Sequence, residues 1–104
     1  HKTNYTTLTQ EKLNTFKNIK GDTEGIVNYG LTIKGIIFTA IFIENKEEKI
    51  IKISFRSQGE FDVNQFARDH FNGGGHQNAA GGKSETSMAE TIAKFEDLVT
   101  KLTI

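Results

Sequence analysis

The sequence predicts a single α/β domain in which a mixed sheet of about four to five strands is packed by about three helices. Its 104 residues suit one hydrophobic core, so residues 1–104 are treated as one domain. The fold class depends on two observations. Apolar, strand-like runs occupy the middle of the chain, and segments with apolar residues at helical spacing stand before and after them.

The first third of the chain predicts one helix and then a short strand. Thr9 is a helix-capping residue, and Gly21 ends the helix. The apolar positions between them recur at helical spacing: Leu13, Phe16 and Ile19. Residues 25–33 are mixed in character, so a short strand at Ile26 and Val27 followed by a turn is expected there.

Two adjacent strands are predicted in the middle of the chain. Residues 36–43 are apolar at nearly every position, as expected for a central strand that is covered on both faces. A polar hairpin loop at residues 44–49 leads into a second strand at residues 50–56. One face of the second strand is apolar, whereas the other is polar and includes Arg56.

Two further helices are indicated by capping boxes. Asp62 with Gln65 opens a short amphipathic helix, which Asn72 and Gly73 close. A second capping box opens the last helix at Ser87. The apolar stripe of the last helix is interpreted as core: Met88, Ile92, Phe95, Val99 and Leu102.

Residues 73–83 are rich in glycine and are expected to form a loop. Three successive glycines let the backbone approach a ligand closely, and their N–H groups can form a nest that binds an oxyanion. His76 can donate a hydrogen bond to the same phosphate, and Arg56 can clamp it with two parallel N–H bonds. The candidate substrate-binding residues are Arg56, Ser57, Gly73, Gly74, Gly75, His76 and Asn78.

A purely structural interpretation of this segment stays open. Glycine is also abundant in flexible loops, where His76 would be exposed by accident. The small residues 78–82 instead indicate a backbone that packs closely against another element or a ligand. The residues alone do not separate these two interpretations.

Composition and spacing argue against several classes of function. Lys and Arg number 13, as do Asp and Glu, so no overall positive field holds long nucleic acid. The longest apolar run falls far short of the roughly 20 residues that span a bilayer, so no membrane partner is expected. No His, Asp and Glu cluster has the spacing of a two-metal centre, so no catalytic residue, metal or cofactor is assigned to this chain. The absence of cysteine fits a reducing compartment, and a cytoplasmic location is expected.

Three segments, taken in order, resemble the DHH-associated C-terminal domain of DHH-family phosphoesterases. They are Phe55-Arg56-Ser57, Asp62-Val63-Asn64 and the run from Gly73 to Gly81. The similarity is greatest to the nanoRNase branch, the oligoribonuclease and 3′-phosphoadenosine-5′-phosphate phosphatase type, where an Arg-Ser pair and a Gly-Gly-Gly-His loop recur in this order. Thr23-Glu24-Gly25 resembles that branch as well.

The resemblance implies that this chain is a fragment of a hydrolase and is inactive alone. In the family, an N-terminal DHH domain supplies Asp and His ligands to two Mn²⁺ ions, which activate the attacking water. That domain would be the partner of this chain. Across the cleft between them, Arg56, Ser57, His76 and the glycine backbone would hold the phosphate or terminal nucleotide of a short oligonucleotide or a phosphorylated nucleotide.

Other functions stay open beside this one. The same domain could serve a cyclic-dinucleotide, RecJ-like or exopolyphosphatase enzyme. It could also be a non-enzymatic RNA-binding module, as the related domain of alanyl-tRNA synthetases suggests, although the neutral charge argues against it. The last alternative is a structural domain whose glycine-rich loop is only a turn.

Overall fold

The computed structural model describes residues 2–19 and 21–102, which form one α/β domain with a five-stranded mixed sheet and four helices. The elements in chain order are β1 (Thr3–Leu8), α1 (Gln10–Asn18), α2 (Thr23–Thr32), β2 (Phe38–Asn45), β3 (Ile50–Ser57), α3 (Val63–His70), β4 (Gly74–His76), β5 (Ala79–Ser84) and α4 (Met88–Thr100). The predicted fold class is confirmed, with four helices in place of about three.

The strands lie in the order β1-β2-β3-β5-β4. β1 runs parallel to β2, and the other neighbouring pairs are antiparallel. A parallel pair needs a long crossover connection, which α1 and α2 supply together. β2 lies between β1 and β3, and its first five residues are all buried, as predicted for a central strand.

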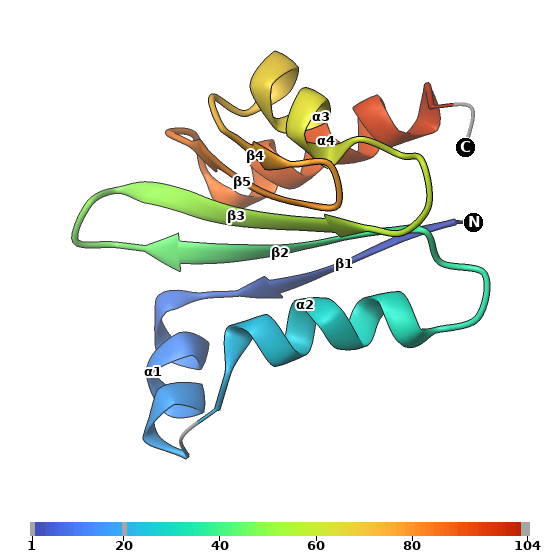
Figure 1. Ribbon diagram of the computed structural model, residues 1–104. Helices are drawn as coiled ribbons and strands as arrows, with labels where there is room; N and C mark the ends of the chain where they lie inside the picture. The colour runs from blue at the N-terminus through green and yellow to red at the C-terminus, as the bar shows by residue number, and fades with distance from the viewer. Residues whose placement is uncertain (1, 20, 103–104) are drawn as a thin grey trace.

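In Figure 1, α3 and α4 lie on one face of the sheet. They pack against it through a cluster of phenylalanine rings. Phe38 and Phe55 from the sheet and Phe95 from α4 are at most 1% exposed. The ring centroid of Phe38 lies 5.6 Å from that of Phe95 and 5.1 Å from that of Phe66 in α3. Large rings in edge-to-face contact at such distances make this face the main core of the domain.

The opposite face of the sheet is covered only in part. In Figure 1, α1 and α2 lie on the side of the sheet away from α3 and α4. They pack on β1 and β2, and α2 also reaches β3. Buried apolar residues of these two helices and two strands form a second, smaller cluster: Leu8, Leu13, Val27 and Ile41. On this face, the half of the sheet formed by β3, β5 and β4 is called the open half below.

Residues 25–33, predicted as a short strand and a turn, belong mostly to α2, so that prediction is wrong. Asp22 caps this helix, because its side chain accepts a hydrogen bond from a backbone N–H of the first turn. Two glycines obscure the helical pattern in the sequence, since glycine is unfavourable inside helices. Gly30 has a tertiary reason, because a Cβ there would lie 2.5 Å from Thr39 Oγ1.

Residues 73–83, expected to form a loop, instead contain β4 and most of β5, which pair as a hairpin. Gly73, just before β4, shows why this segment is rich in glycine: a Cβ there would lie 1.9 Å from the carbonyl oxygen of Gly81. Glycine gives only a weak strand signal, so the sequence did not predict the hairpin. The sequence did not predict β1 either, because the residues of this strand are mostly polar.

The predicted helix starts are confirmed. Thr9, Asp62 and Ser87 occupy the N-cap positions of α1, α3 and α4, and each side chain accepts a hydrogen bond from a backbone N–H. Asn72 follows α3 with a φ of 51°, consistent with the predicted end of that helix. None of the described helices combines the length and apolar character that crossing a bilayer requires.

Candidate functional site

Strand register brings Arg56 and His76 onto the same face of the sheet. Arg56 of β3 is paired with Ala79 of β5, and Ala79 is paired in turn with His76 of β4. Side chains directly opposite one another in antiparallel strands point to the same face. Neighbouring strands are about 4.8 Å apart, which separates the Arg56 and His76 backbones by about 10 Å. Two long polar side chains therefore flank a small alanine on the open half of the sheet.

The Arg56 guanidinium is held in place by the protein. Its Nη1 donates to the carbonyl oxygens of Phe55 at 2.8 Å and Ala80 at 3.5 Å. Its Nη2 donates to the carboxylate of Glu24 in α2. The Arg56 side chain is only 16% exposed. This cation is therefore positioned beside the open half before any ligand arrives.

His76 differs from Arg56 in its exposure. It is the last residue of β4 and lies at the turn of the hairpin, where its side chain is exposed. An exposed imidazole at the edge of the sheet is accessible from solvent. The structure thus brings together two of the predicted substrate-binding side chains.

Ser57 and Asn78 are placed differently from what the sequence predicts. Ser57 is 5% exposed and lies on the opposite face from Arg56, because successive residues of a strand alternate between faces. Its hydroxyl donates to the carbonyl of Phe61 at 2.7 Å and accepts from the Asn78 amide at 2.9 Å. The geometry favours a bracing role for both side chains, and direct contact of either with a ligand stays a prediction.

The predicted nest of glycine N–H groups is not available in this structure. The N–H of Gly73 donates to the carbonyl of Ala67 at 3.1 Å, and that of Gly75 donates to Asn64 Oδ1 at 2.8 Å. A nest needs successive N–H groups directed at the same anion. The glycines instead allow β4 to approach its neighbours, since a Cβ on Gly75 would lie 2.7 Å from the carbonyl oxygen of Ala79.

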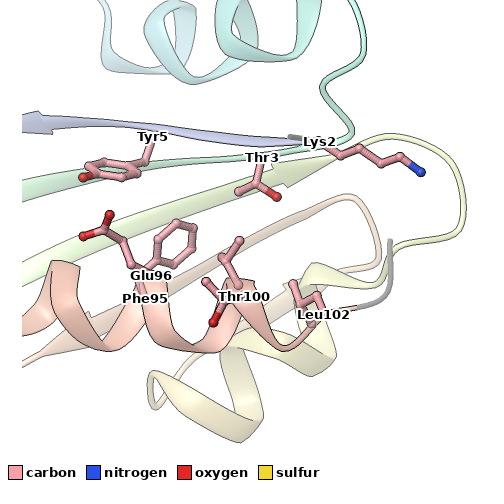
Figure 2. A pocket seen from close by; sticks show the side chains of 8 residues that line it. Lys2, Thr3, Tyr5, Phe95, Glu96, Thr100 and Leu102 are labelled. Carbon is pink, nitrogen blue, oxygen red and sulfur yellow. The ribbon is translucent and has the colours of Figure 1, made fainter.

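A cavity of about 620 Å³ lies elsewhere, between β1 and the end of α4. Figure 2 shows Thr3 and Tyr5 of β1 facing Phe95 and Leu102 across it. It opens on the phenylalanine face, and none of the predicted site residues lines it. In the described part of the chain, no group of three or more acidic or histidine side chains is arranged to hold a metal ion.

The sequence did not predict Glu24 as the partner of Arg56. Glu24 appears there only within a segment of family resemblance, yet the structure pairs its carboxylate with Arg56. The pairing depends on α2, which the sequence did not predict. A signal was present, because Asp22 followed by Thr23 and Glu24 is a helix start with an acidic first turn.

The chain is similar to a family model and to solved structures, three of which are described here. The model of the DHHA1 domain matches residues 6–103. An exopolyphosphatase-related protein from Bacteroides fragilis is 43% identical over 96% of this chain, with a TM-score of 0.86. An uncharacterized protein from Helicobacter pylori G27 is 22% identical over 95%, with a TM-score of 0.62. PggH, a pGpG-specific phosphodiesterase from Vibrio cholerae, is 10% identical over 72%, with a TM-score of 0.55.

These matches cover only part of the similar proteins. The chain spans 29% of the Bacteroides fragilis protein and 26% of each of the other two. At 22% and 10% identity, the last two show a shared fold alone. A search among curated proteins found no match.

Proposed function

The chain belongs to the DHHA1 domain family, and from that premise we propose that it is the substrate-holding domain of a DHH-family phosphoesterase. Its role is to bind a phosphate group of the substrate through Arg56 and His76. The substrate is a short oligonucleotide or a phosphorylated nucleotide such as 3′-phosphoadenosine-5′-phosphate.

One observation carries this proposal. The register of β3, β5 and β4 presents a guanidinium and an imidazole on the same face, with only Ala79 between them. Both groups donate hydrogen bonds to phosphate oxygens, and a guanidinium can do so with two parallel N–H bonds. The small side chain of Ala79 leaves room for the phosphate to approach the sheet.

Bond cleavage is assigned to a separate N-terminal DHH domain. In this proposal that domain would hold two Mn²⁺ ions, which would activate the attacking water. The described residues of this chain show no comparable ligand cluster. A phosphate held at Arg56 would orient the scissile bond toward those ions. Orientation of this kind lowers the entropic part of the activation barrier.

A second candidate substrate is polyphosphate. It is favoured by the 43% identity to the exopolyphosphatase-related protein from Bacteroides fragilis. Polyphosphate offers the same phosphate oxygens to Arg56 and His76 but has no base or ribose. Comparing a dinucleotide with a polyphosphate of similar charge therefore separates the two candidates.

The test is an isotope-edited NMR titration of the chain with a 5′-phosphorylated dinucleotide. We expect saturable shifts at Arg56 and His76. Arg56→Ala should weaken binding about tenfold or more, and His76→Ala about two- to tenfold, as expected for lost charged and neutral hydrogen bonds. Arg68→Ala and His70→Ala are matched controls, since both residues lie on α3 across the sheet.

The two α3 variants show whether a loss of binding is specific to the proposed site. Equal losses in all four variants would indicate a general charge effect and would contradict the site. Absence of any shift at millimolar ligand in the folded chain would overturn the proposed function for this chain. A variant that loses its cooperative melt would show instead that the residue is needed for folding.

A further inference from the structure

Glu24 is the acidic side chain that contacts Arg56 in the described part of the chain. It lies in the first turn of α2, next to the open half of the sheet. The Glu24 side chain is 56% exposed, whereas that of Arg56 is 16% exposed. The ion pair is therefore anchored on its arginine side and accessible to solvent on its carboxylate side. A ligand reaching Arg56 meets this carboxylate.

The contacts of Arg56 leave part of its guanidinium available. A guanidinium has five N–H donors. Among the described residues, the carbonyl oxygens of Phe55 and Ala80 and the carboxylate of Glu24 accept hydrogen bonds from three of them, which leaves two. A phosphate can accept hydrogen bonds from donors of this kind. A phosphate that takes them lies beside a carboxylate of the same sign.

The charge of the phosphate decides how much this carboxylate matters. A phosphodiester carries one negative charge, whereas a phosphomonoester carries about 1.5 to 2 at pH 7. Asp22 stands two residues before Glu24 and adds a second carboxylate at the start of α2, where it accepts a hydrogen bond from the Glu24 N–H at 3.0 Å. Repulsion from this end of α2 therefore grows with the charge of the ligand.

We propose that Glu24 lowers the affinity of the Arg56 site for doubly charged phosphomonoesters more than its affinity for singly charged phosphodiesters. The proposal rests on the proposed function, because it assumes that Arg56 binds the substrate phosphate. It deepens the proposed function by stating which phosphate groups Glu24 disfavours at Arg56: terminal phosphates and inorganic phosphate, relative to internal linkages. Glu24 acts as a specificity-determining residue.

Two probes isolate the charge of the ligand. Adenosine 5′-monophosphate and its methyl ester share base, ribose and phosphate and differ by one methyl group and one charge. Their affinities for the 104-residue chain are measured by NMR titration at pH 8. We expect Glu24→Gln to tighten monophosphate binding about two- to fivefold while changing ester binding less.

Glu11→Gln is the matched control. Glu11 also lies in the first turn of a helix, α1, so this variant makes the same change in net charge and in helix-dipole compensation. No contact joins Glu11 to Arg56 in the described residues. The ratio of the two affinities should therefore stay at its original value in Glu11→Gln. A dispersed amide spectrum verifies that each variant is folded.

The outcomes separate this proposal from the proposed function. If both probes shift Arg56 but Glu24→Gln leaves their affinity ratio unchanged, the role of Glu24 is wrong and the phosphate site stands. A ratio that changes equally in Glu11→Gln also overturns the role of Glu24. If neither probe shifts Arg56 or His76 in any variant, the phosphate site itself fails, and the selectivity falls with it.

Discussion

The two faces of the sheet present different side chains of the same strands. On the phenylalanine face, β2 and β3 bury large rings against α3 and α4. On the other face, α1 and α2 cover β1 and β2, and four residues of these elements form the smaller buried cluster. The open half of this face presents Arg56, Ala79 and His76. Burial of apolar area is the dominant stabilising term in folding, so one face carries most of the stability. The other is thereby free to carry polar groups that a ligand can reach.

The glycine-rich hairpin connects the two faces. The two strands of the hairpin pack closely because side chains are missing, as Gly73 and Gly75 show. That packing fixes the position of His76 relative to Arg56. Backbone packing therefore sets the positions of the polar side chains on the open half, whereas burial of the phenylalanine rings provides most of the stability.

The largest expected change in stability distinguishes the two apolar clusters. Phe38→Ala removes a fully buried ring of the main cluster and should lower the free energy of unfolding by about 3–5 kcal/mol. Leu13→Ala acts in the smaller cluster, where the side chain is 8% exposed, and should cost about 2 kcal/mol. Denaturant unfolding measures both. An equal or larger loss for Leu13→Ala would contradict the unequal roles of the two faces.

The second prediction compares two glycines of the hairpin. Gly73→Ala places a Cβ 1.9 Å from a backbone oxygen. This substitution should lower the free energy of unfolding by about 3 kcal/mol, the upper end of the usual range for overpacking. Gly81→Ala is the control, because its nearest neighbour atom lies 3.5 Å away, and it should change stability by no more than about 0.5 kcal/mol. Thermal melts of both variants test this. Similar melting temperatures would show that β4 does not approach β5 as closely as described.

The smallest effect sharpens the assignment of Ser57. Ser57→Ala deletes the hydroxyl that joins Phe61 to Asn78 and should cost about 1–2 kcal/mol. Ser54→Ala, on the opposite face of the same strand, should cost less than about 0.5 kcal/mol. Unfolding and dinucleotide titration are measured together. Unchanged stability with lost binding in Ser57→Ala would return Ser57 to the ligand side.

The sequence by itself determined the elements whose signals are local. Caps at Thr9, Asp62 and Ser87 and the apolar run of β2 marked their elements correctly, because capping and periodicity involve residues close in the chain. It also identified Arg56 and His76 as phosphate-binding candidates, because few side chains offer suitable donors.

Tertiary structure alone decided which of the candidates share a face. Strand register places Arg56 on the same face as His76, and the alternation of side chains turns Ser57 away from both. Only folding shows that Glu24, 32 residues before Arg56, is its partner. The physical reason is that register and packing depend on contacts between distant segments, whereas glycine and polar residues carry little local signal for the strand or helix they enter.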